Sequence, residues 1–180
     1  MKARRSVCLL LSWILLAAAV AAQQQALQVV SLARDGRVLV SLKLTDAFTD
    51  EVRAAIQSGM NTSFVYDIEL KRGSTLWLDR TIEATTLTAT VRFDNLTRRY
   101  TLTRTQDGRI DRADSTDRED DARIWLTEFE RLPLFSSTSL EANAEYYLRV
   151  RAHATPRSLS FVWPWARNDV TGHVKFTFLK

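Results

Sequence analysis

Residues 27–44 have the sequence LQVVSLARDGRVLVSLKL, and this stretch decides the fold. Apolar residues recur mainly with a period of two on both sides of Asp35-Gly36, although Leu39 breaks the strict alternation. A period of two is typical of strands that bury one face. Asp-Gly supplies the positive φ angles that a two-residue hairpin turn needs. The stretch therefore predicts a β-hairpin from Leu27 to Leu44.

The same alternation recurs along the rest of the chain. Between residues 63 and 71 it predicts a strand whose inward face is apolar, and between residues 86 and 93 threonines alternate with apolar residues, as in a sheet with one solvated face. The strand predicted at 76–82 is weaker, because Asp79 interrupts it. Further strands are expected around Tyr100 and Leu102, at 146–151 and at 174–178, with turns at Gly73-Ser74, Asp94-Asn95 and Asp107-Gly108.

Two helices are expected among the strands. The first begins at Thr49, a residue that caps helices, and has Asp50 and Glu51 in its first turn, where the helix dipole favours acidic side chains. Its apolar stripe is Val52, Ala55 and Ile56, and Gly59 ends it.

The second helix begins at Thr116–Glu119, which has the spacing of a capping box. Its apolar residues recur at steps of three and four, and Pro133 ends it. We expect this helix to cover one face or end of the strands, with Trp125 and Phe129 pointing inward. The apolar residues are Ala122, Trp125, Leu126, Phe129 and Leu132.

These elements predict a mainly β fold, an antiparallel Ig-like β-sandwich of about eight strands with two covering α-helices. Residues 23–180 contain no internal repeat, low-complexity tract or long linker, so we expect them to form one domain.

Residues 1–22 are typical of a secretory signal peptide. Lys2, Arg4 and Arg5 precede an apolar run of 14 residues, which ends in small residues before Gln23. A membrane-spanning helix needs roughly 20 apolar residues. We therefore expect cleavage after Ala22 and a periplasmic location, the alternative being an uncleaved signal that tethers the protein to the inner membrane.

Cleavage changes both the charge and the redox chemistry of the chain. Three of its 25 Lys and Arg residues lie in residues 1–22, whereas all 21 Asp and Glu residues lie beyond them, so the mature net charge is +1. A nearly neutral domain has no global attraction for nucleic acid. The single cysteine, Cys8, leaves with the signal, which excludes a disulfide-linked partner.

Neither histidine lies in a known catalytic motif. Strand parity places His153 and His173 on solvent-facing sides, and the G-x-S-x-G motif is absent. An acidic run between Asp111 and Asp121 suggests calcium, but the D-x-D-x-D-G pattern is missing and arginines interrupt the acids. We interpret the run as a charged loop followed by an acidic helix start. No catalytic residue, metal ligand or cofactor is expected.

The segment Phe161–Arg167 carries the candidate contact residues. Pro164 favours an extended chain, in which Trp163 and Trp165 share one side. Together with Arg157 and Arg167, they could bind a sugar, a lipid headgroup or a partner protein. The alternative is that both indoles plug the end of the sandwich.

Several stretches together resemble a bacterial family, the domain of unknown function 4390. The resemblance covers nearly the whole mature chain and implies an exported protein of a Gram-negative-like bacterium, but it supplies no activity, cofactor or catalytic residue. The stretches are 35–40, 44–49, 55–59, 91–100, 132–135, 146–151 and 172–178.

From this we expect a non-enzymatic, protein-interacting module of the cell envelope, whose partner is another envelope protein. The alternative is a module that binds carbohydrate or lipid headgroups through exposed tryptophans.

Overall fold

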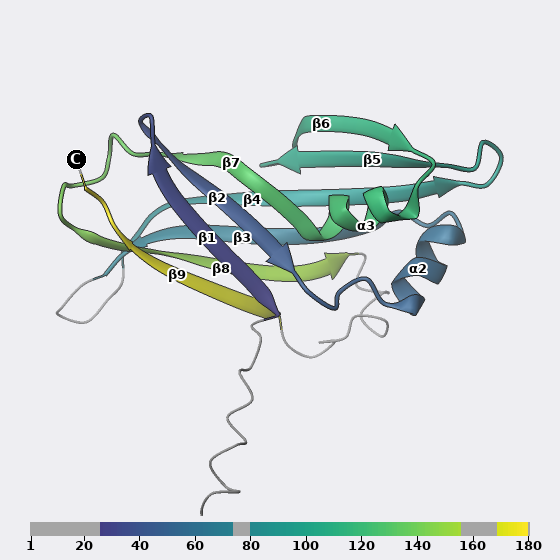
Figure 1. Ribbon diagram of the computed structural model, residues 1–180, viewed down its shortest axis with the longest axis horizontal. Coiled ribbons are helices and arrows are strands. Elements are labelled where there is room, and N and C mark those ends of the chain that lie inside the picture. The colour runs from purple at the N-terminus through teal and green to yellow at the C-terminus, as the bar shows by residue number, and fades with distance from the viewer. Residues whose placement is uncertain (1–25, 74–79, 156–168, 180) are drawn as a thin grey trace, which may run out of the picture.

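The computed structural model describes residues 26–73, 80–155 and 169–179, which form a sandwich of two antiparallel sheets (Figure 1). The three-stranded sheet has the order β1-β2-β7, and the six-stranded sheet has the order β6-β5-β4-β3-β8-β9. The antiparallel sandwich predicted from the sequence is thus confirmed, with nine strands in the described residues. In chain order they are β1 (Leu27–Arg34), β2 (Arg37–Leu44), β3 (Thr62–Arg72), β4 (Arg80–Asp94), β5 (Arg99–Gln106), β6 (Arg109–Thr116), β7 (Glu128–Ser136), β8 (Glu145–Thr155) and β9 (Val170–Thr177).

The first hairpin is confirmed. Strands β1 and β2 pair without a register shift, from Leu27 opposite Leu44 to Arg34 opposite Arg37. Both turn residues have positive φ, 52° at Asp35 and 75° at Gly36, as a two-residue hairpin turn requires.

The core lies between the two sheets, where every second residue of the central strands is buried. The predicted inward faces of β3 and β4 are confirmed, because their alternate apolar residues are shielded from water. Strand β3 contributes Phe64, Tyr66, Ile68 and Leu70, and β4 contributes Leu87, Ala89 and Val91. The strand expected at 76–82 is not separate in its described part, because Arg80 and Ile82 belong to the long strand β4. Residues 76–79 lie outside the described residues.

Helix α2 (Asp50–Gln57) forms as predicted. The Thr49 hydroxyl accepts a hydrogen bond from the Val52 backbone N–H at 3.3 Å. Val52, Ala55 and Ile56 are buried, and beyond the helix Gly59 has a φ of +85°. The cap, the stripe and the stop are all local signals, which is why the sequence predicts them.

The second helix is shorter than predicted and begins later. Helix α3 (Glu119–Thr127) has Arg118 at its N-cap, without a side-chain cap bond, so the predicted capping box does not form. Thr116 instead accepts a hydrogen bond from the Arg118 N–H and donates one to Asp121. The helical pattern continues to Leu132, but Glu128–Ser136 pairs with β2 and forms β7. Phe129 is buried as expected, but from a strand.

The prediction of a charged loop before this helix is also wrong in part. Residues Arg109–Thr116 form strand β6, which pairs with β5. All its residues except Thr116 are exposed. A strand without a buried face shows no apolar alternation, so the sequence pattern did not reveal it.

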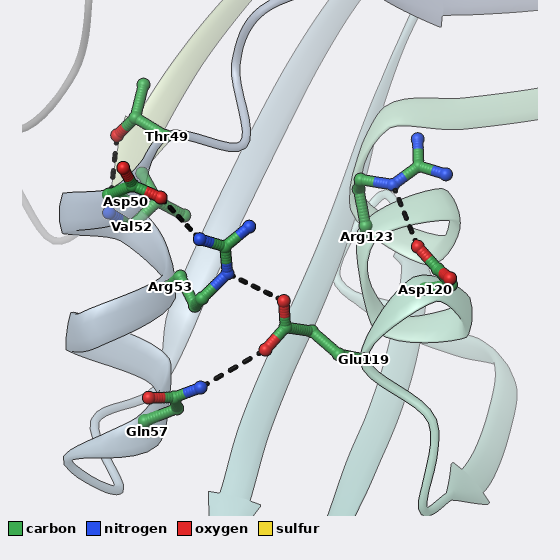
Figure 2. A network of polar contacts seen from close by, with 8 residues as sticks. All are labelled: Thr49, Asp50, Val52, Arg53, Gln57, Glu119, Asp120 and Arg123. Carbon is green, nitrogen blue, oxygen red and sulfur yellow. Dashed lines mark hydrogen bonds and ion pairs between the residues drawn. The ribbon is translucent and has the colours of Figure 1, made fainter.

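Helices α2 and α3 lie at the same end of the sandwich, and a polar network joins them (Figure 2). The Arg53 guanidinium donates to Glu119 at 2.6 Å and also pairs with Asp50. Gln57 donates to the other Glu119 oxygen at 3.1 Å. The Glu119 carboxylate raises the pKa of Arg53 through this hydrogen bond and its charge. A single α3 carboxylate therefore links two turns of α2.

The two sides of the sandwich differ. On one side β1 packs against β9, where Gly172 lies so close to Leu27 and Val29 that no side chain fits. On the other side β6 and β7 are the outer strands of their sheets. No helix of the described residues combines the length and apolarity needed to span a membrane.

Candidate functional site

A groove of about 590 Å³ lies on the side of the sandwich where β6 and β7 are the outer strands. Residues of β5, β6, α3 and β7 line it, and we call it the β6/β7 groove. Its lining includes Arg104, Arg112, Asp121, Ile124, Trp125 and Glu130.

Arg104 is a half-buried cation at the inner wall of the groove. It donates to the backbone carbonyls of Trp125 at 2.9 Å and Glu128 at 2.8 Å. Its guanidinium also lies 4.3 Å from the ring centroids of both Trp125 and Phe129. Carbonyls at a helix C-terminus lack intrahelical donors and carry partial negative charge, so they suit a cation.

Burial and, to a smaller extent, the charge of the neighbouring Arg112 together lower the pKa of Arg104 to about 10. Arg104 therefore stays cationic at neutral pH, although its desolvation is costly. Its Nε is buried and has no hydrogen-bond partner among the described residues. The guanidinium is held by two carbonyls and two aromatic rings rather than by a carboxylate.

Tyr66, on β3 of the six-stranded sheet, binds the same C-terminal end of α3. Its hydroxyl donates to the Leu126 carbonyl at 2.7 Å, and its ring meets Phe129 edge-on at 5.0 Å. Burial raises the pKa of this hydroxyl, which keeps it a donor. Arg104 and Tyr66 together bind three carbonyls where α3 ends and β7 begins. This explains how the chain changes from helix to strand without a loop.

Trp125 forms the floor of the groove. It is 6% exposed, and its indole N–H donates to the Thr103 carbonyl at 3.3 Å. Arg112 approaches the same ring at 5.4 Å. Two guanidiniums therefore contact the indole, which leaves little free ring face for a ligand.

The groove walls carry four carboxylates and two guanidiniums. Three of these carboxylates have partners: Asp114 with Arg112 at 3.6 Å, Asp121 with Thr116 at 2.8 Å, and Glu128 with Lys43 at 3.2 Å. Glu130 is exposed on β7 and has no ion pair among the described residues. Because Arg104 is turned toward carbonyls, the accessible charge of the groove is acidic.

The residues expected to contact a partner, Trp163, Trp165, Arg157 and Arg167, all lie outside the described residues. The acidic run is divided, because Asp111 and Asp114 lie on β6 whereas Glu119, Asp120 and Asp121 lie on α3. No group of three or more potential metal ligands gathers in the part of the chain that the structure describes.

The histidines lie on strands β8 and β9, away from the groove. His173 is exposed, as strand parity predicts. His153 is half-buried, and its Nδ1 lies 3.8 Å from an Asp67 oxygen.

Sequence reasoning missed Arg104 as a site residue. The signal was present, because Arg104 continues the inward series of Tyr100 and Leu102 on β5. A charged residue at an inward strand position needs a partner or a wet cavity, and Arg104 has both.

The chain was compared with known families and proteins. No curated protein and no solved structure shows significant similarity to it. The sequence model of one family, the domain of unknown function DUF4390, matches residues 21–162. This match covers most of the chain and agrees with the resemblance seen in the sequence, so the protein belongs to the DUF4390 family.

Proposed function

We propose that the protein is an exported, non-enzymatic interaction module of the bacterial cell envelope, and that its β6/β7 groove binds a segment of another envelope protein. The observation that carries this proposal is the open side of the sandwich. There the outer strands of both sheets flank a groove of about 590 Å³, whereas the opposite side is closed by β1 and β9. Grooves of this size are within the range of binding sites.

The charge of the groove indicates the chemistry of the segment. Four carboxylates line it, and Glu130 is exposed without an ion pair among the described residues. Ile124, which is 42% exposed, and Leu132 add an apolar surface. The matching partner is a segment that carries lysine or arginine beside aliphatic residues, because opposite charges steer association and an apolar anchor supplies affinity.

Most polar groups of the groove already have hydrogen-bond or ion-pair partners, which favours a binding role over catalysis. Arg104 binds two carbonyls, and three of the carboxylates already have partners. A general acid or base needs a group free to exchange a proton with a substrate. A preorganised set of paired charges is better suited to recognising a partner.

N-terminal sequencing tests the proposed location. The protein recovered from the periplasmic fraction is expected to begin at Gln23, because cleavage after Ala22 follows the small residues of the signal. Replacement of Leu15 by arginine interrupts the apolar run and is expected to leave the uncut chain in the cytoplasm. A wild-type protein that begins at Met1 in the cytosolic fraction would contradict export.

Site-specific photo-crosslinking in cells tests the groove. A photoreactive residue at Ile124 is expected to form an adduct with one reproducible envelope protein, and mass spectrometry should map it to a segment that contains lysine or arginine. Glu130→Lys is expected to reduce the adduct by about tenfold, because it reverses an exposed charge on the groove wall.

Two controls accompany this experiment. A photoreactive residue at Leu96, which is 95% exposed in the turn between β4 and β5, should give no such adduct. Glu83→Lys makes the same charge change on β4, outside the groove, and should leave the Ile124 adduct unchanged. Failure of Ile124 to form an adduct, or an adduct insensitive to Glu130→Lys, would refute the groove as the binding site.

A further inference from the structure

Strand β6 is an outer strand with an unusual composition. It has the sequence Arg-Ile-Asp-Arg-Ala-Asp-Ser-Thr from Arg109 to Thr116 and pairs only with β5 among the described residues. The backbone N–H and C=O groups of its other edge therefore have no strand partner in the part of the chain that the structure describes. Outer strands usually avoid pairing through charged side chains and bulges. In β6, however, the charges follow a pattern that is complementary to itself.

The complementarity appears when two copies of β6 lie antiparallel. With Asp111 of one copy opposite Arg112 of the other, Arg109 lies opposite Asp114, and Ile110 lies opposite Ala113. Two-fold symmetry repeats each pair. The pairing thus opposes arginine to aspartate in four places and apolar to apolar in two, and both kinds of cross-strand pair are stabilising.

The register with β5 places these pairs on matching faces. Arg112 and Asp114 lie opposite Arg104 and Leu102, on the groove side of the sheet. Ala113 lies opposite Thr103, and Ile110 lies opposite Thr105, on the outer side. Ile110 is 71% exposed, which is unusual for an isoleucine in a charged strand. The pairing gives this side chain an apolar neighbour, Ala113 of the second copy.

A bulge supports the central ion pair. Arg104 lies opposite Arg112, and Thr105 lies opposite Ile110. Asp111 is therefore the extra residue of a β-bulge, in which Asp111 and Arg112 together oppose Arg104. The charge of Asp111 also acts on Arg104, raising its pKa against the effect of burial. The bulge thus places Asp111 next to Arg112 at the centre of β6, where Arg112 of a second copy would lie opposite it.

The neighbouring registers are all unfavourable. A slip of one residue places Asp111 opposite Asp111 or Arg112 opposite Arg112, depending on its direction. A slip of two places Arg109 opposite Arg112, or Asp111 opposite Asp114. Like charges directly opposite each other destabilise a strand pair. The charges that protect this edge from unspecific pairing thus select a single register with a second copy.

We propose that the protein forms a two-fold symmetric dimer in which β6 pairs with β6 of a second copy and joins the two six-stranded sheets. Each copy uses this edge once, so the contact closes and does not propagate into a filament. The two-fold axis crosses the sheet between Asp111 and Arg112, and the β6/β7 grooves of both copies open on the same face of the joined sheet. The proposal does not depend on the function proposed above.

Charge reversal tests the dimer by sedimentation equilibrium of the purified protein over a concentration series. The wild type is expected to show a monomer–dimer equilibrium. Arg109→Glu places carboxylates opposite each other at two symmetry-related positions, and Asp114→Arg does the same with guanidiniums. Each variant alone is expected to weaken dimerisation by about tenfold or more.

Mixing the two variants gives the decisive result. In a heterodimer of Arg109→Glu with Asp114→Arg, every reversed residue meets an opposite charge, so an equimolar mixture should recover the wild-type dissociation constant. This recovery also shows that both variants are folded. Arg92→Glu, the same change at an exposed position of β4, should leave the equilibrium unchanged.

Three results would overturn the proposal: a wild type that stays monomeric throughout the concentration series, a dimer insensitive to both reversals, or a mixture that stays as weak as its components. A monomer whose β6 binds a different protein would also overturn it.

Discussion

Replacing Gly172 by alanine is expected to lower the free energy of unfolding by about 2 kcal/mol, within the range for an overpacked core. A Cβ at Gly172 would lie 2.8 Å from the Cγ2 of Val29 and 2.9 Å from the Leu27 carbonyl oxygen. The carbonyl belongs to the backbone of β1 and cannot rotate away, so the variant must separate β1 from β9. Urea denaturation measures the effect as a lower midpoint with an unchanged slope.

Gly73→Ala is the matched control. The nearest atom to a Cβ at Gly73 is the Glu145 carbonyl oxygen at 4.0 Å, an ordinary contact, and its φ is not in the left-handed region. The same substitution there should be neutral or slightly stabilising, because alanine restricts the unfolded chain. Equal stability of Gly172→Ala and the wild type would show that β1 and β9 are not packed as closely as described.

Arg104→Met is expected to destabilise the fold by about 2 kcal/mol. Methionine fills much of the volume between Trp125 and Phe129. It removes the hydrogen-bond donors to the Trp125 and Glu128 carbonyls, however, and an unsatisfied buried acceptor costs about 1–3 kcal/mol. Removing a desolvated charge offsets part of this loss, since burial lowers the pKa of Arg104 to about 10. Denaturant unfolding of the variant gives the net effect.

Arg112→Met is the control that separates the loss of the Arg104 carbonyl bonds from the loss of any arginine beside Trp125. Arg112 also contacts Trp125, but its side chain is 62% exposed and its ion pair with Asp114 is long, at 3.6 Å. Its replacement should change stability by less than about 0.5 kcal/mol. If both variants lost the same stability, the carbonyl bonds of Arg104 would not be what holds the end of α3.

The prediction from the sequence is wrong for the segment in which helix α3 gives way to strand β7. Residues 119–132 have helical spacing throughout, yet the helix ends at Thr127 and Phe129 belongs to β7. The change depends on distant partners: the Arg131 N–H donates to the Ser41 hydroxyl, 90 residues earlier in the chain. Local periodicity contains no information about such a partner.

The candidate site was predicted only in fragments. The sequence predicts the inward direction of Trp125 and Phe129 but not the groove, because the groove exists only where β6 and β7 are the outer strands of different sheets. The aromatic pair Trp163 and Trp165, which the sequence singled out, lies outside the described residues.

The sequence by itself determined the first hairpin, the buried face of β3 and the start of α2, because a turn, a period of two and a helix cap each depend on residues close in the chain. Only the tertiary structure decided that an exposed, charged segment becomes β6, that α3 gives way to β7, and that Arg104 lines the groove. Strand β7 and the contacts of Arg104 depend on partners distant in the chain, where a hydrogen bond can override the local preference of the side chains. Strand β6 pairs with its neighbour β5 and is missed because it lacks an apolar alternation.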